Sequence, residues 1–341
     1  MMSSFTITRL VLFAVLIACL ISASTLLQQD AKLVPSVAAA ELGYSSSISG
    51  NVALVGAYGV NSNKGAAYIF RSSDGRATWP SSETQKLTAS DGVASDKFGW
   101  SVSISGNVSL VGAPFATVGG KSQRGAAYIF RSPDGGTTWP SGETQKLTAS
   151  DGNTDSMLGR SVSISGDIAL AGAWLHDFSG IIDPGAAYVF RSPNGGTTWP
   201  SQETQKLTAS DAGKNYHLGY SCFVSGNIAL VGAIKSHVGS TDQGAVYVFR
   251  SSDGGTTWPS SETQKLTASD GASVDWFGNS VSFSGNISLV GARRADIGSN
   301  SYQGAAYIFR SPDGGATWPS SSETQKLTAS DGAAGDALGW S

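Results

Sequence analysis

The chain has 341 residues and a formal net charge of −3, and only 14% of its residues are charged. Such a weak negative charge supplies no basic surface for nucleic acid, so nucleic acid is not expected as a partner. An apolar content of 40% is sufficient for a packed core and excludes global disorder.

The N-terminal segment is predicted to direct export. Residues 1–9 end in Arg9, and residues 10–27 carry no charge. Small residues at 22–24 provide a cleavage site, which is the layout of a signal peptide. The uncharged run could also span a bilayer, for which about 18–20 residues suffice. We therefore predict a signal peptide or a membrane anchor over residues 1–24 and a spacer over 25–40. Either assignment makes the protein secreted or attached to the cell surface, with membrane contact only through an uncleaved N-terminal segment.

From residue 42 onward a single unit repeats. The octapeptide Thr-Gln-Lys-Leu-Thr-Ala-Ser-Asp occurs five times without change, and its final aspartates are separated by 60, 60, 59 and 61 residues. Self-similarity at a fixed period indicates stacked or radially arranged units. The repeats are expected near 42–97, 98–157, 158–217, 218–276 and 277–337, and the start of another lies at 338–341.

Each repeat is predicted to contain four short strands. In the second copy, residues 101–105 alternate polar and apolar, Gly106-Asn107 indicates a tight hairpin, and 108–113 continues as a strand. A variable loop leads to an apolar third strand at 125–130, and the fourth, at 144–149, is the most polar. This gradient suits a blade whose outer strand faces solvent and whose middle strands pack on both faces. We predict an all-β fold, a β-propeller of about five four-stranded blades that closes as a ring or remains incomplete.

Several motifs in fixed order resemble an FG-GAP repeat. They are Phe98-Gly99 followed by Ser101-Val-Ser-Ile-Ser-Gly106, then Val111-Gly-Ala113, then Gly125-Ala-Ala-Tyr-Ile-Phe130. The resemblance extends over residues 42–341. It implies the β-propeller found in integrin α subunits and in many exported microbial proteins, and a role in adhesion or protein recognition at the cell surface.

A second resemblance overlaps the first. Ser132–Trp139 is similar to the Asp-box, S-x-D-x-G-x-T-W, of sialidase-type propellers. The box recurs in full at 251–258 and 311–318, has Asn194 in place of Asp at 192–199, and has Arg76 in place of Gly at 72–79. In those families the box is a structural hairpin. An Asp carboxylate can bind backbone N–H groups across its own turn, which gives the same interpretation.

The loops between the second and third strands differ most among the copies, and repeat symmetry should place them on one face of the ring. Binding residues tend to lie on loops that a rigid scaffold holds, although relaxed selection would produce the same variability. The speculative ligand-binding residues in these loops are Trp174, His176, Phe178, His237, Arg293 and Arg294.

The resemblance to integrins implies calcium as a possible cofactor, because integrin repeats often carry a DxDxDG calcium loop. None of the five variable loops contains that pattern. Paired acids precede most Phe/Leu-Gly dipeptides and are weak metal candidates, because calcium needs several oxygen ligands. Turn formation explains them equally well. We therefore expect no cofactor. The paired acids concerned are Asp91, Asp96, Asp270, Asp275, Asp331 and Asp336.

Asn107 and Asn286 stand in Asn-x-Ser sequences and are glycosylation sites if the source is a eukaryote. No catalytic residues are predicted. The arginines after each third strand and the glutamates before each fourth strand repeat regularly, whereas an active site normally breaks repeat symmetry. The three histidines, His176, His217 and His237, follow no metal or triad spacing.

The sequence thus predicts an exported, non-catalytic recognition or adhesion module that presents variable loops to a protein or glycan at the cell surface. The alternatives are a glycan-active hydrolase or lectin of sialidase-like type, or a structural fragment of a longer repeat protein.

Overall fold

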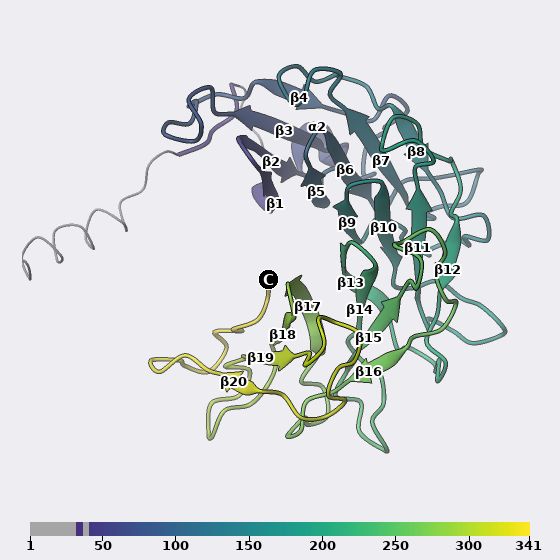
Figure 1. Cartoon of the computed structure of the whole chain (residues 1–341), viewed down its shortest axis with the longest axis vertical. Coiled ribbons are helices and arrows are strands. Elements are labelled where there is room, and N and C mark those ends of the chain that lie inside the picture. The colour runs from purple at the N-terminus through teal and green to yellow at the C-terminus, as the bar shows by residue number, and fades with distance from the viewer. Residues whose placement is uncertain (1–31, 37–40) are drawn as a thin grey trace, which may run out of the picture.

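The computed structural model describes residues 32–36 and 41–341, which form five four-stranded antiparallel sheets around a common centre (Figure 1). In every sheet the four strands are neighbours in the order in which they occur in the sequence. The first strand of each sheet lies nearest the centre (Figure 1). The all-β propeller prediction is confirmed, and each sheet is one blade.

The four strands of a blade occupy equivalent positions in each repeat. The innermost strands are β1 (Leu42–Ser49), β5 (Ser101–Ser105), β9 (Ser161–Ser165), β13 (Leu218–Ser225) and β17 (Phe277–Ser284). The second strands are β2 (Val52–Ala57), β6 (Val108–Ala113), β10 (Ile168–Ala173), β14 (Ile228–Ala233) and β18 (Ile287–Ala292). The third strands are β3 (Ala66–Arg71), β7 (Ala126–Arg131), β11 (Ala186–Arg191), β15 (Ala245–Arg250) and β19 (Ala305–Arg310). The outer strands are β4 (Gln85–Leu87), β8 (Gln145–Leu147), β12 (Gln205–Leu207), β16 (Gln264–Leu266) and β20 (Gln325–Leu327).

The described body contains one short helical element that the sequence did not predict, α2 (Val60–Asn63). Asn61 and Ser62 within it have positive φ angles of 50° and 58°, so the segment is a left-handed turn in the first variable loop. Within the described ranges, no helix combines the length and apolarity needed to cross a bilayer. The predicted signal or anchor at 1–24 lies outside the described residues, as does most of the predicted spacer.

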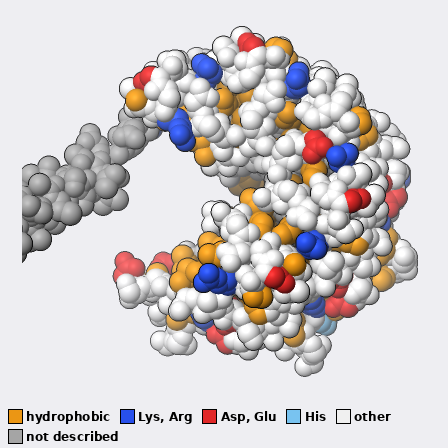
Figure 2. All heavy atoms as spheres, viewed as in Figure 1, with side chains coloured by type: hydrophobic (Ala, Val, Ile, Leu, Met, Phe, Trp, Pro, Cys, Tyr) orange, Lys and Arg blue, Asp and Glu red, His pale blue; other side chains and the backbone are white. Residues whose placement is uncertain are grey.

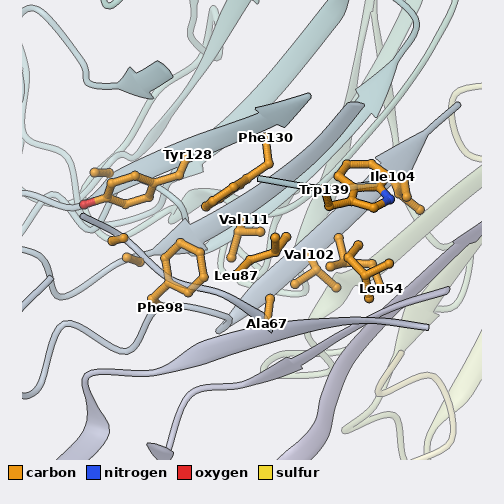
Figure 3. Packing of buried hydrophobic residues seen from close by; sticks show 14 of the residues in the cluster. Leu54, Ala67, Leu87, Phe98, Val102, Ile104, Val111, Tyr128, Phe130 and Trp139 are labelled. Carbon is orange, nitrogen blue, oxygen red and sulfur yellow. The ribbon is translucent and has the colours of Figure 1, made fainter. Parts of the chain in front are cut away.

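The core lies between neighbouring blades. Between blades 1 and 2, Leu54 and Ile69 of one sheet are fully buried against Tyr128, Phe130 and Trp139 of the next (Figure 3). Complete burial of one large apolar side chain stabilises a fold by about 1.5–3 kcal/mol. The second and third strands are apolar on both faces because each blade packs against two neighbours.

Glycines allow the blades to meet backbone to backbone near the centre. A Cβ atom on Gly112 of β6 would lie 2.1 Å from the carbonyl oxygen of Gly159, which belongs to the next blade. The hydroxyl of Ser101 donates a hydrogen bond to the same carbonyl over 2.8 Å. This contact explains the fixed glycines and serine of the motif. Its four equivalents pair Gly56 with Gly99, Gly172 with Gly219, Gly232 with Gly278, and Gly291 with Gly339.

The octapeptide is invariant because its polar residues join consecutive blades. Asp151, which follows β8, accepts hydrogen bonds of 2.7 Å from the Tyr188 hydroxyl and from the Lys206 ammonium, both in blade 3. Ser150 donates its amide and hydroxyl to the carboxylate of Glu203, also in blade 3. Asp91, Asp211 and Asp270 bind the next blade's tyrosine and lysine in the same way.

A hydrogen-bonded turn precedes each outer strand. In blade 2, Asp134 Oδ1 accepts hydrogen bonds from the Thr138 amide at 2.8 Å and the Ser132 hydroxyl at 2.9 Å. The Trp139 indole donates to the Gly136 carbonyl at 3.2 Å. Asn194 accepts the equivalent amide hydrogen bond at 2.8 Å in the third copy. The turn therefore has a structural role, while its kinship with the Asp-box stays a prediction.

The five blades form an open arc. Figure 2 shows a gap between the first and last blades, with hydrophobic side chains along one edge. On blade 5, Ile287 and Leu289 are 44% and 40% exposed, whereas the equivalent Val52 and Leu54 of blade 1 are 2% and 0% exposed. The apolar face that a following blade covers elsewhere is therefore open on blade 5.

Residues 32–36 cover part of the opposite face, on blade 1. Leu33 packs against the apolar residues of that blade, and Ser36 donates two hydrogen bonds of 2.6 Å to Glu83. Ser90 makes the equivalent pair of bonds to Glu143 of the second blade. The segment Lys32-Leu-Val-Pro-Ser36 thus occupies the place of the Lys-Leu-Thr-Ala-Ser part of the octapeptide.

Substitution of Gly112 tests the backbone contact at the centre. Because the added methyl group would overlap the Gly159 carbonyl, Gly112→Ala should lower the free energy of unfolding by about 1–3 kcal/mol. Urea denaturation followed by circular dichroism measures this change. Gly142→Ala is the control, since nothing lies within 4 Å of its Cβ position. Equal stability of the two variants would contradict the assigned role.

The turn aspartates should contribute to acid sensitivity. Hydrogen bonds, first of all from the backbone amides of Thr138, Thr257 and Thr317, lower the pKa values of Asp134, Asp253 and Asp313 to about 2. Their stabilising effect is present above the unfolded-state pKa near 3.8 and is lost as pH falls toward 2.

Replacement of all three by Asn, the natural residue at 194, should keep stability near neutral pH and reduce its decline between pH 4 and pH 2. Thermal unfolding measured across that range gives the comparison. An unchanged pH dependence would show that these carboxylates carry no acid-sensitive stability.

Candidate functional site

One position inside the repeat motif varies while its neighbours are fixed. It follows each Phe/Leu-Gly pair and precedes the serine that binds the next blade. The glycine and serine are constrained by the close approach of two backbones, but the side chain between them is free to differ. Its occupants are Tyr44, Trp100, Arg160, Tyr220, Asn279 and Trp340.

The antiparallel register brings a second variable position to the same end of the blade. Leu42 of β1 lies opposite Ala57 of β2, so Tyr44 and the loop residue Tyr58 are neighbours. In blade 5, Phe277 is paired with Ala292 in the same way. Asn279 and Arg293, the first residue of the following loop, therefore occupy the positions that Tyr44 and Tyr58 have in blade 1. Both positions break the repeat symmetry and meet near the inner strands.

In the first two blades this end is aromatic. The rings of Tyr44 and Tyr58 lie 4.7 Å apart, and their centroids are 4.8 and 5.0 Å from that of Trp100. Phe115 lies edge-on to Trp100 at 5.7 Å. The Lys97 ammonium lies over Phe115, 4.2 Å from the ring centroid, a favourable cation–π distance.

Arginines continue the cluster into the later blades. The guanidinium of Arg160 lies 4.2 Å from the ring centroid of Tyr220 and 5.5 Å from that of Trp100. Trp174 packs edge-on against Tyr220 at 5.5 Å. Aromatic residues from blades 2 and 4 are therefore linked through the arginine of blade 3.

Blade 5 supplies two more arginines. The Arg293 guanidinium lies 4.4 Å from the ring of Trp276 and 3.8 Å from that of Trp340. Arg294 lies 3.8 Å from Trp276. We call the whole set the central aromatic–arginine cluster. It consists of Tyr44, Tyr58, Trp100, Phe115, Arg160, Trp174, Tyr220, Trp276, Arg293, Arg294 and Trp340.

The two ends of the cluster lie within electrostatic range of each other. Burial raises the pKa of Tyr44, while the charges of Arg160 and Arg293 oppose the increase. Burial is also the largest cause of the lowered pKa of Arg293, and the charges of Arg294 and Arg160 act in the same direction. Tyr44 belongs to the first blade and Arg293 to the last, so both blades contribute to the field at the centre.

The structure brings together three of the six residues that the variable loops suggested. Trp174, Arg293 and Arg294 belong to the central cluster. His176 and Phe178 lie instead beside the Asp151–Lys206 contact, where Lys206 is 4.5 Å from the Phe178 ring centroid. His237 stacks at 5.3 Å on Tyr216 and lines a separate hollow of about 240 Å³.

Tyr44, Trp100, Arg160 and Tyr220 were missed by sequence reasoning. The signal that could have identified them is the single variable position within an otherwise fixed motif.

One group of side chains superficially resembles a catalytic triad. The ring of His176 is 3.2 Å from Ser156 Oγ and 3.5 Å from Asp151 Oδ2. Ser156 and His176 are only 0% and 1% exposed, and Ser156 Oγ accepts the Asn153 amide hydrogen bond at 2.8 Å. The group extends the repeated contact between blades, and a substrate has no access to the serine.

The paired acids, the weak metal candidates, occupy two kinds of position. Asp91 and Asp270 bind lysine and tyrosine of the next blade, while Asp96 and Asp275 each accept a backbone amide of their own loop. Asp336 likewise accepts the Ala333 amide. In residues 32–36 and 41–341 no three His, Cys, Asp or Glu side chains are grouped for a metal ion.

The two Asn-x-Ser asparagines are half-buried at hairpins. Asn107 and Asn286 donate side-chain hydrogen bonds to the carbonyls of Ser132 and Ser311, so the turn itself explains their presence. Glycosylation at either residue stays a prediction.

Hollows of about 450 and 500 Å³ lie at the outer rim, one on blade 2 beside Trp139 and one on blade 3 beside Trp199. Equivalent repeat residues line both. They follow the repeat symmetry and are therefore weaker site candidates than the central cluster.

Comparison with protein-family models finds the FG-GAP repeat at residues 27–70, 81–130, 141–190, 201–249 and 260–309. The chain belongs to the FG-GAP repeat family. No curated protein matches it. Each FG-GAP match from the second onward begins before an outer strand and ends in the third strand of the next blade. The family unit therefore spans two blades, as do the contacts of the octapeptide.

His217 provides a pH probe of the cluster. Its ring lies 4.8 Å from that of Trp174, and burial, followed by the charge of Lys235, lowers its pKa to about 4. Stability associated with the neutral ring is present above pH 6.5 and declines as pH falls toward 4. Proton NMR should show one imidazole titrating near pH 4, assigned by its loss in His217→Gln. Titration of that resonance near 6.5 would contradict its burial.

Proposed function

We propose that this FG-GAP propeller is an exported, non-catalytic recognition or adhesion module that binds its partner through the central aromatic–arginine cluster. The observation that carries the proposal is the convergence of variable, symmetry-breaking side chains from all parts of the arc on one site. Structural contacts in this chain repeat from blade to blade, whereas this cluster does not.

The chemistry of the cluster suits binding. Trp, Tyr and Arg are the residues most enriched among those that dominate binding energy at interfaces. Most of them lie in a strand or within two residues of a strand end, which limits their freedom and reduces the entropy lost when a ligand is bound. Tyr44 and Trp340 remain 43% and 61% exposed, so part of the aromatic surface is accessible from solvent.

The same chemistry supports a role without catalysis. Glycoside hydrolysis commonly requires a pair of carboxyl groups beside the scissile bond. The cluster contains no Asp or Glu, and the buried Ser156–His176 pair cannot meet a substrate. Export rests on the predicted N-terminal segment, and the surface location follows from that prediction.

The test is binding of the full chain to arrays of glycans and peptides. A double variant, Trp100→Ala with Tyr220→Ala, should lose at least about tenfold in affinity for any bound ligand, because large aromatic contacts commonly contribute more than about 1 kcal/mol each. The matched control is Phe178→Ala with His237→Ala, which removes aromatic rings from variable loops outside the cluster.

Loss of binding only in the control variant would move the site to the outer loops and refute the proposal. Hydrolysis of a bound glycan by the pure protein would refute the absence of catalysis. Circular dichroism and thermal unfolding of each variant establish that the blades remain folded.

A further inference from the structure

The arginines of the central cluster have no acidic partners. None of the ion pairs found in residues 32–36 and 41–341 includes Arg160, Arg293 or Arg294. Elsewhere in the chain, Lys146, Lys206, Lys265 and Lys326 each bind an aspartate. A half-buried group of like charges without counter-charge is unfavourable by itself and attracts an anion.

The cluster contains hydrogen-bond donors that the protein itself does not pair. An arginine stacked on an aromatic ring uses the face of its guanidinium, while its N–H groups point outward in the plane. Among the described residues, Arg293 Nε and the indole nitrogens of Trp100 and Trp276 are buried and have no hydrogen-bond partner. In the same region Asn279 Oδ1 and His217 Nδ1, a donor or an acceptor according to the tautomer, are also unpaired. The three guanidinium groups without acidic partners therefore favour a ligand rich in acceptor oxygens.

The inner strands of blades 2, 3 and 4 do not offer an edge for an extended peptide. The amides of Ile104, Ile164 and Val224 donate to serine hydroxyls of the preceding blade, at 3.1, 3.1 and 3.0 Å. Because these N–H groups are already paired, a peptide cannot add to the sheet as a further strand. Beside these three blades, recognition at the centre depends on the aromatic and guanidinium side chains.

We propose that the central aromatic–arginine cluster binds a saccharide that carries a carboxylate. The aromatic rings pack against the C–H face of the sugar, and the guanidinium groups bind the carboxylate, with paired N–H···O bonds where the geometry permits. This assignment rests on the proposed function and specifies its ligand class. The absence of acidic side chains from the cluster disfavours an amine or a basic peptide.

The experiment compares two probes on the unaltered protein. Trigalacturonic acid and its fully methyl-esterified form share a sugar backbone, but only the first carries negative charge. Tryptophan fluorescence and calorimetry should show binding of the acid that is at least about tenfold tighter than that of the ester, because charged groups form the stronger hydrogen bonds. Binding of the acid should also weaken as salt is raised from 0.05 to about 0.5 M.

Arginine variants test which guanidinium groups bind the carboxylate of the probe. Arg160→Gln and Arg293→Gln should each weaken binding of the acid by about tenfold and leave ester binding nearly unchanged. Arg131→Gln, the same change at the end of β7 beside the outer hollow, should have no effect. The comparison of acid with ester remains decisive even if a variant fails to fold.

The outcomes separate this inference from the function on which it rests. If acid and ester bind equally and the Trp100→Ala, Tyr220→Ala variant loses both, the cluster is a binding site but the anion preference is wrong. If neither probe binds at millimolar concentration, or polyglutamate binds in their place, the acidic-saccharide assignment is overturned. If the acid binds undiminished to every cluster variant, the site itself is wrong.

Discussion

The structure depends on the contact of two glycine backbones where neighbouring blades converge. A blade can approach the next one closely only if no Cβ atom lies between Gly112 and the Gly159 carbonyl, and the other blades repeat this arrangement. The serine hydroxyl that binds the same carbonyl then fixes the spacing. Apolar packing between the middle strands supplies most of the stabilisation, but this small contact sets how the sheets are arranged around the centre. It accounts for the glycines and the serine that are fixed in all five copies of the repeat in this chain.

The same constraint explains where functional variation can occur. Residues that join blades, such as Asp151 with Tyr188 and Lys206, cannot change without loss of an interaction with the neighbour. The residue between the fixed glycine and serine makes no hydrogen bond that recurs in every copy, although Asn279 donates one to the Trp340 carbonyl. Five copies of one scaffold can therefore carry Tyr, Trp, Arg, Tyr and Asn at that position without disturbing the fold. A binding site at the centre arises from the residues that differ between copies, while the repeated residues hold neighbouring blades together.

The fold could be predicted because its signals are local. Alternating residues at 101–105, the Gly106-Asn107 turn and the fixed period of the octapeptide all depend on neighbours in the sequence. The site could be predicted only in part. Trp174, Arg293 and Arg294 stood out by composition, but their proximity to Trp100 and Arg160 depends on the register between β17 and β18 and on the radial arrangement of blades. His176 lies in the same loop as Trp174 yet is buried in a contact between blades. Loop membership therefore does not decide which side chains meet.

The open arc gives the central cluster a further physical consequence. Contacts in a repeat array act mainly between neighbours, so the first and last blades stabilise each other little through the strands themselves. Residues 32–36 cover part of the outer face of blade 1, whereas Ile287 and Leu289 of blade 5 remain exposed. Tyr44 and Arg293 come from these two blades, and the charge of Arg293 acts on Tyr44 across the centre. A ligand that contacts both residues binds the folded arc and not the unfolded chain, so its binding free energy adds to the stability of the arc. The position of the cluster thus couples recognition to the relative placement of the end blades, which no sheet or loop of the described chain connects directly.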